Sequence, residues 1–85
     1  MRIYKYPLEL NDAQMVLLPP NYKILHVGEQ NRQLTMWAAV EPSPEIVEVM
    51  IEIIGTGNDY NPEGKTFLGT VIQGEFVWHI FKVED

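Results

Sequence analysis

Residues 43–57 read Ser-Pro-Glu-Ile-Val-Glu-Val-Met-Ile-Glu-Ile-Ile-Gly-Thr-Gly, and their conformation decides between an all-β fold and a mixed one. A helix is one interpretation, because the Ser-Pro-Glu at the start and the glycine after Ile54 are typical helix signals. Against it, β-branched residues alternate with Glu48 and Glu52 in a period of two. The residues therefore favour a strand over 45–54, with the helix as the alternative.

The rest of the chain shows similar tracts of β-branched and aromatic residues, separated by turn residues. The predicted strands are 2–6, 14–18, 22–30, 34–40, 45–54, 65–72 and 76–83. Strand 22–30 is predicted to place Leu25 and Val27 on one face and Ile24 and His26 on the other. Residues 55–64 are rich in Gly, Asn, Asp and Pro, which predicts a long loop.

Six to seven short strands joined by short loops predict an all-β fold, either a small antiparallel sandwich or a partly open barrel. Residues 1–85 are expected to form a single domain. Gly69 lies inside a predicted strand, which indicates a bulge or a close backbone approach. A small sheet protein has exposed edge strands and a small hydrophobic core. Because assembly covers the edges and buries more surface, we expect a homo-oligomer.

Composition excludes several classes of protein. The chain has 85 residues, a net charge of −6 and no cysteine, so a disulfide framework and a thiolate site are ruled out. Residues 1–40 carry a net charge of +1 and residues 41–85 a net charge of −7. No basic cluster exists for direct binding of nucleic acid or a membrane surface. The first residues lack the apolar core of a signal peptide, so we expect a cytoplasmic protein.

Catalytic and metal-binding patterns are absent from the sequence. His26 and His79 lie far apart and lack metal-ligand spacing, so we expect no metal. The single serine, Ser43, lies between two prolines and is a poor nucleophile candidate. We therefore expect no enzymatic activity and no cofactor.

The loop and the aromatic residues offer a candidate binding site. At the end of a strand, the backbone N–H groups of Gly55-Thr56-Gly57 can point together at an anion. Lys65, just beyond the loop, can supply a positive charge for it. Aromatic rings nearby would stack on a planar ligand such as a nucleotide, although core and interface packing explains them equally well. The candidate ligand-binding residues are Gly55, Thr56, Gly57, Tyr60, Lys65, Trp78, His79 and Trp37.

The sequence resembles a family of small phage-encoded and prophage-encoded proteins of unassigned function. The resemblance rests on these stretches, in this order: Met1-Arg2-Ile3-Tyr4-Lys5-Tyr6-Pro7-Leu8, Lys23-Ile24-Leu25, Met36-Trp37-Ala38-Ala39-Val40, Ile54-Gly55-Thr56-Gly57, Phe67-Leu68-Gly69-Thr70-Val71 and Val77-Trp78-His79-Ile80-Phe81. In that family the segment before Gly-Thr-Gly looks like a strand, which strengthens the strand prediction for 45–54. Relatives often have histidine where this chain has Asn58.

The resemblance implies a phage source and no mechanism. Small phage proteins without catalytic machinery commonly act by stoichiometric binding, so we expect a binding protein in the cytoplasm of an infected bacterium. One function is an oligomer that counters host defence by sequestering a nucleotide immune signal, such as a cyclic dinucleotide, as a small anionic ligand. The alternative is an acidic inhibitor that mimics nucleic acid toward a basic host protein, such as a nuclease or CRISPR effector. The acids expected to serve that role are Glu45, Glu48, Glu52, Asp59 and Glu63. A minor structural role in the virion is a third possibility.

Overall fold

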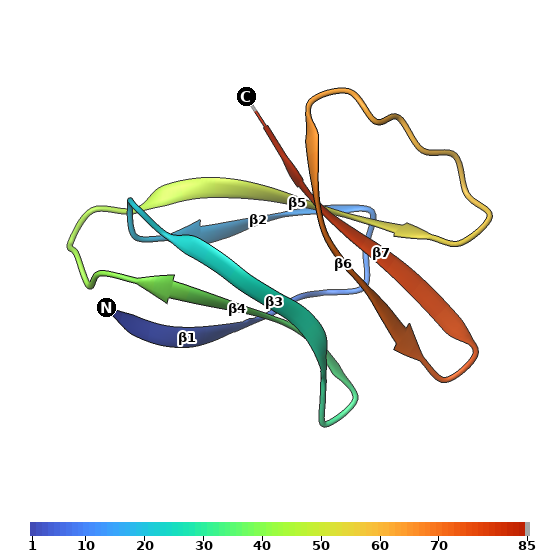
Figure 1. Cartoon of the computed structure of the whole chain (residues 1–85), viewed down its shortest axis with the longest axis horizontal. Helices are drawn as coiled ribbons and strands as arrows, with labels where there is room; N and C mark the ends of the chain where they lie inside the picture. Colours follow the sequence, from blue (N-terminus) through green and yellow to red (C-terminus); the bar gives the residue numbers. More distant parts are fainter. Residues whose placement is uncertain (85) are drawn as a thin grey trace.

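The structure is a computed structural model that describes residues 1–84. Its seven strands are β1 (Arg2–Pro7), β2 (Ala13–Leu18), β3 (Lys23–Gln30), β4 (Gln33–Val40), β5 (Val47–Gly55), β6 (Lys65–Gln73) and β7 (Phe76–Val83). They form a three-stranded antiparallel sheet in the order β1-β4-β3 and a four-stranded antiparallel sheet in the order β2-β5-β7-β6. The two sheets pack as a small sandwich (Figure 1), which confirms the predicted fold class. The described part of the chain, residues 1–84, offers no helix that could traverse a lipid bilayer.

The stretch that decides the fold class is strand β5. It pairs with β2 along one side and with β7 along the other. Val49, Ile51 and Ile53 are buried on one face of the strand, whereas Glu48 is exposed on the other face. Ile46 is 59% exposed and precedes the strand. The period-two alternation therefore predicted this segment correctly, and the helical alternative is wrong.

Two tight turns set the register of the hairpins. Asn31 and Arg32 join β3 to β4 with φ angles of 52° and 65°, which is the positive-φ pattern of a type I′ hairpin turn. Gly74 has a φ of 62° in the two-residue connection between β6 and β7. The register that follows from this second turn places Thr70 opposite His79.

The core lies between the inner faces of the two sheets. β4 runs through the centre of the three-stranded sheet and buries every second side chain. The buried hydrophobic cluster consists of Leu8, Leu18, Val27, Leu34, Met36, Ala38, Val40, Val49, Ile51, Ile53, Val71 and Ile80. Because this cluster draws on both sheets, it holds the sandwich together by removing apolar surface from water.

Strand β3 departs from strict alternation. A bulge shifts its register against β4 between Ile24 and His26. As a result, Ile24 packs against the core together with the buried Val27, while Leu25 is 45% exposed. The predicted grouping of Leu25 with Val27 and of Ile24 with His26 is therefore wrong, because the extra residue of a bulge moves the side chains that follow it to the other face.

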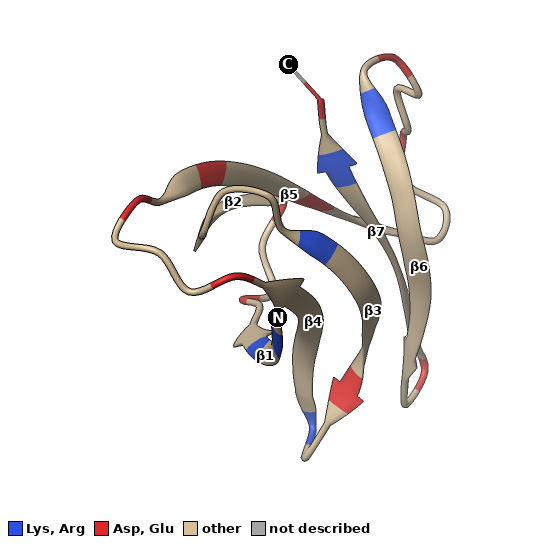
Figure 2. Ribbon diagram, turned by 60° about the vertical axis from the view of Figure 1, so that its left-hand side comes forward, with Lys and Arg blue, Asp and Glu red and all other residues tan. Residues whose placement is uncertain are grey.

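The two sheets meet along a seam between β3 and β6, where the strands lie side by side without forming a ladder (Figure 2). β6 has a bulge between Phe67 and Gly69, as the sequence suggested. A Cβ atom on Gly69 would lie 2.8 Å from a methyl group of Val27, so only glycine permits this approach. Near the hairpin tips, the Gln73 side-chain amide donates a hydrogen bond of 3.1 Å to the carbonyl of Arg32.

Candidate functional site

The loop between β5 and β6 folds back over the outer face of β7. Its first residue, Thr56, donates its backbone N–H to the carbonyl of Val77, at 3.1 Å. At the other end, the carbonyl of Gly64 accepts a hydrogen bond of 2.6 Å from the N–H of Glu84. Gly57 has a φ of 95°, which a residue with a side chain rarely adopts. Both ends of this loop, residues 56–64, are thus anchored to β7 or the residue that follows it.

The middle of the loop makes an aromatic wall. The rings of Tyr60 and Phe81 stack with centroids 4.9 Å apart and planes 24° apart. Phe67 meets the same Phe81 ring at 5.5 Å in a tilted arrangement. Phe81 is only 6% exposed although it lies on the outer face of the sheet, because these two rings cover it. Tyr60 itself stays 49% exposed and can present ring surface to a ligand.

A pocket of about 320 Å³ opens between the loop and β7. Its lining residues are Ile54, Gly55, Thr56, Gly57, Asn58, Tyr60, His79 and Phe81. Apolar walls with a few polar groups are typical of sites for small organic ligands. The lining contains no Lys, Arg, Asp or Glu.

His79 is fixed inside this pocket by two threonines. A hydrogen bond of 2.7 Å joins its Nε2 to the Thr56 hydroxyl, and one of 2.9 Å joins its Nδ1 to the Thr70 hydroxyl. A hydroxyl both donates and accepts, so the pair of threonines supports either tautomer of the ring. The orientation of the imidazole is therefore set before any ligand arrives.

Lys65 lies next to the pocket, but its charge is already paired. Its ammonium group is 2.5 Å from a carboxylate oxygen of Glu52, and both side chains are largely shielded from water. The same ammonium lies 5.8 Å from the centre of the Tyr60 ring. The lysine thus contacts the aromatic wall through Tyr60. Because its charge is paired with Glu52, it is less able to bind an anion than the sequence suggested.

The Gly55-Thr56-Gly57 backbone likewise offers fewer free donors than expected. The N–H of Thr56 is used by the carbonyl of Val77, and the N–H of Asn58 is used by the carbonyl of Gly55 in a turn. An anion nest needs successive N–H groups that point outward together. The segment therefore works mainly as a turn that shapes the pocket wall.

The structure brings five of the predicted site residues together in the pocket and places Lys65 beside them. The five are Gly55, Thr56, Gly57, Tyr60 and His79. Trp78 lies on the opposite face of β7, where it packs against the core and donates a 3.2 Å hydrogen bond to Gln73. Trp37 lies on the three-stranded sheet, with its ring 5.7 Å from that of His26.

The expectation that both tryptophans join this site is therefore corrected by the geometry. Neighbouring residues of a strand point to opposite faces, so Trp78 and His79 cannot line the same pocket. Sequence reasoning also missed Thr70, which holds His79. Counting back from the turn at Gly74 would have placed Thr70 opposite His79, so a signal for it was present.

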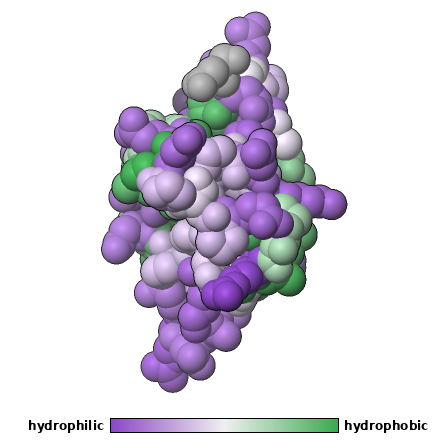
Figure 3. Space-filling model, turned by 90° about the vertical axis from the view of Figure 1, so that its left-hand side faces the viewer, coloured by the Kyte–Doolittle hydropathy of each residue, from purple (hydrophilic) through white to green (hydrophobic). Residues whose placement is uncertain are grey.

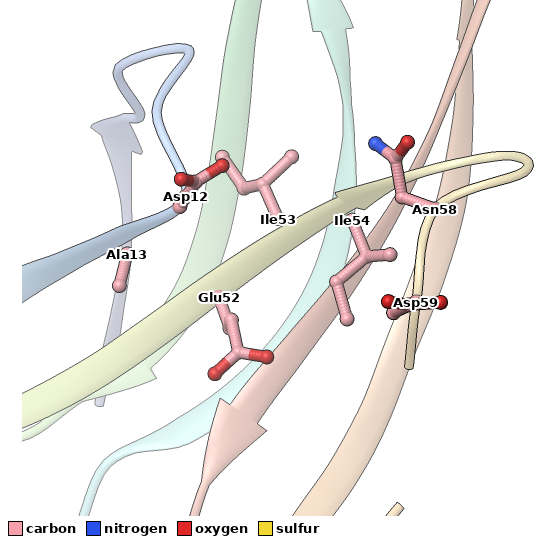
Figure 4. A pocket seen from close by; sticks show the side chains of 7 residues that line it. All are labelled: Asp12, Ala13, Glu52, Ile53, Ile54, Asn58 and Asp59. Carbon is pink, nitrogen blue, oxygen red and sulfur yellow. The ribbon is translucent and has the colours of Figure 1, made fainter. Parts of the chain in front are cut away.

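A second hollow adjoins the end of β5 and the start of the loop (Figure 4). Its volume is about 220 Å³, and it is lined by Asp12, Ala13, Glu52, Ile53, Ile54, Asn58 and Asp59. Ile54 and Asn58 line both hollows, so the start of the loop forms the partition between them. Three of the lining residues of this second hollow are acidic. Within residues 1–84, no group of side chains has the arrangement of a metal site.

Comparison with known proteins identifies a family but no characterised relative. The family model described as "Domain of unknown function (DUF7352)" matches residues 1–85. None of the curated proteins and none of the solved structures compared with the chain matches it.

Proposed function

We propose that this chain, which belongs to the DUF7352 family, is a non-catalytic binding protein that holds a planar heterocyclic ligand in the pocket beside His79. The observation that carries the proposal is the combination of the exposed Tyr60 ring with an imidazole whose orientation is fixed by Thr56 and Thr70. A stacking surface and fixed hydrogen-bonding groups together suit the base of a nucleotide.

The polar groups at the pocket suit the edge of a base. Thr56 is an exposed residue whose hydroxyl holds His79, and Asn58 lines the same pocket. Amide and hydroxyl groups both donate and accept, so they match the mixed donors and acceptors of a nucleobase. The volume of about 320 Å³ lies at the lower end of the range for small-molecule sites.

The phosphate groups of such a ligand would lie outside the pocket. The lining contains no Lys, Arg, Asp or Glu, and Lys65 is paired with Glu52. We therefore propose that the ligand is recognised through its base, while its phosphates stay in water or meet cations of another copy of the chain. This arrangement favours a signal nucleotide with two bases, such as a cyclic dinucleotide, since each base can occupy a separate pocket.

The hydrogen bonds around His79 favour binding over catalysis. A hydroxyl, an imidazole and a third group in series resemble a nucleophile, a base and an orienting residue. Here the third group is the Thr70 hydroxyl, 2.9 Å from Nδ1, where a triad has a carboxylate. A hydroxyl does not stabilise an imidazolium ion as a carboxylate does, so the series lacks its charged member.

We place this binding activity in the cytoplasm of an infected bacterium, as the likeness to small phage proteins implies. A protein made in quantity during infection can lower the free concentration of an immune signal simply by holding it. Sequestration of that kind needs a pocket and no turnover, which agrees with the site described above.

The test is a thermal-unfolding screen with cyclic dinucleotides, mononucleotides and nucleosides. A ligand at 100 times its Kd should stabilise the protein by about 2.7 kcal/mol. Tyr60→Ala should abolish the shift, whereas Tyr4→Ala, a comparably exposed tyrosine on the other sheet, should retain it. The proposal fails if no compound in the panel raises the melting temperature, or if Tyr60→Ala binds as well as the parent chain.

The acidic-inhibitor alternative has weaker support from the arrangement of charges. Acidic residues lie along β5, near the end of β3 and in the loops (Figure 2). Glu48 is near the start of β5 and Asp59 lies beyond its end, so roughly 20 Å of strand separates their positions along the chain. Glu52 is neutralised by Lys65. If Glu45→Lys with Glu48→Lys abolished binding to a basic host protein while Tyr60→Ala did not, this alternative would replace our proposal.

A further inference from the structure

Strand β2 is an edge strand without the features that protect the other edges of the two sheets. It pairs with β5 without interruption from Ala13↔Glu52 to Leu18↔Val47, so it has no bulge. Its sequence, Ala-Gln-Met-Val-Leu-Leu, contains no charge, proline or glycine. Natural proteins usually interrupt exposed edges with such residues, because an open edge pairs readily with another strand.

Each of the other three edge strands is protected. β1 contains Arg2, Lys5 and Pro7 within six residues. β3 and β6 each carry a bulge and lie against one another at the seam. Three of the four sheet edges are thus protected, whereas the fourth, β2, is regular and uncharged.

The outer side of β2 is also apolar and exposed. Met15 is 46% exposed and Leu17 is 52% exposed. On the neighbouring strand β5, the half-buried Met50 lies opposite Met15 and extends the apolar surface, whereas the exposed Glu48 lies opposite Leu17 and ends it. Among the described residues, no backbone hydrogen bond beyond the sheet ladder involves residues 13–18. The outward backbone groups of β2 are thus available to a further strand.

One end of the molecule offers no large apolar face to a partner. The end of the molecule seen in Figure 3 is mostly hydrophilic, with its hydrophobic atoms in small separate patches. The net charge of −6 makes every pair of copies repel at long range. A contact between copies therefore favours an uncharged element, and β2 is such an element.

We propose that two copies of the chain pair antiparallel along β2, which joins their four-stranded sheets into one sheet of eight strands. A two-fold axis at Val16 places Met15 opposite Leu17 of the second copy and Gln14 opposite its Leu18. Residues directly opposite in an antiparallel pair share a face, so outward Met15 meets outward Leu17. Met15 and Leu17 of the two copies then form a continuous apolar cluster. Because β2 contains no charged residue, the pairing brings no like charges together.

The first test measures mass in solution by sedimentation or light scattering over a range of concentrations. The parent chain should be dimeric, and Leu17→Lys should raise the dimer dissociation constant at least about tenfold, because a lysine would enter the apolar cluster in each copy. Ile3→Lys is the matched control on the β1 edge, where Ile3 is 64% exposed, and should leave the constant unchanged. Circular dichroism checks that both variants fold.

The second test fixes the register and uses the absence of cysteine from the chain. Under mild oxidation, a mixture of Met15→Cys and Leu17→Cys chains should form a disulfide-linked heterodimer. Directly opposite residues lie about 5 Å apart, within disulfide range, whereas Met15 and its own copy would be diagonal neighbours about 7–8 Å apart. A parent chain that stays monomeric, or Met15→Cys alone linking as well as the mixture, would overturn the proposed pairing.

Discussion

Replacing Gly69 by alanine tests the seam between β3 and β6 directly. The added Cβ would lie 2.8 Å from a methyl group of Val27, closer than carbon atoms approach in folded proteins. Val27 is only 3% exposed and cannot move into solvent. Overpacking of this kind costs about 1–3 kcal/mol. Gly69 also has a φ of 157°, unfavourable for alanine, which adds about 1 kcal/mol.

The expected total, about 2–4 kcal/mol, is a large share of the stability of a domain of this size, which is roughly 4–13 kcal/mol. Urea unfolding followed by tryptophan fluorescence would measure it. Val27→Ala removes the methyl group in question and should itself cost about 2 kcal/mol. In the double variant, Gly69→Ala with Val27→Ala, the new Cβ no longer meets a methyl group. The loss of unfolding free energy should therefore be smaller than the sum of the two single losses by about 1–3 kcal/mol.

Gly28→Ala is the matched control on β3. Its Cβ would lie 3.0 Å from Nε2 of His26, an exposed side chain that can rotate away, so the cost should stay below about 1 kcal/mol. The reasoning about the seam is refuted if Gly69→Ala is as mild as Gly28→Ala, or if the Gly69 and Val27 changes are strictly additive.

Three further changes probe the site and its surroundings. Thr70→Val removes one hydrogen bond from His79 and should cost about 1 kcal/mol, with a broadened imidazole signal by NMR showing the freed ring. Glu52→Gln leaves a part-buried lysine without its carboxylate and should destabilise by about 1–3 kcal/mol in a urea melt. The Thr66 hydroxyl holds the pKa of Glu84 below its usual value. This carboxylate therefore stabilises the fold above its unfolded pKa, and the contribution is lost as pH falls through the folded pKa. The stability difference between the parent chain and Thr66→Val should accordingly shrink at acid pH, and a constant difference would contradict this assignment.

Much of the fold is predictable because strand alternation is a local property. The buried residues of β5 alternate with glutamates in the sequence itself, and the structure follows that pattern. The faces of β3 were not predictable, because the bulge at Leu25 depends on how β3 fits against β4 and adds no signal to the sequence. The assignment of each strand to one of the two sheets also depends on long-range pairing that periodicity does not encode.

The site was predictable in part for the same reason. Gly55, Thr56 and Gly57 mark a turn locally, and His79 faces that turn because β5 and β7 pair. The partner of Lys65 is Glu52, thirteen residues away on another strand, so only the folded sheet reveals that the lysine is neutralised. Trp78 could have been excluded from the sequence alone, since it is adjacent to His79 in a strand.

The seam between β3 and β6 has a mechanical consequence. Read around the molecule, the strands follow the order β1-β4-β3, then β6-β7-β5-β2, and the backbone ladder is interrupted where β3 meets β6. Side chains alone hold that junction, with Val27 lying over the bare backbone of Gly69. Under denaturant or mechanical load, the sheets should part along this line while the hairpin β3–β4 and the hairpin β6–β7 remain intact. The three-stranded and the four-stranded sheet should then be the units in which the fold comes apart.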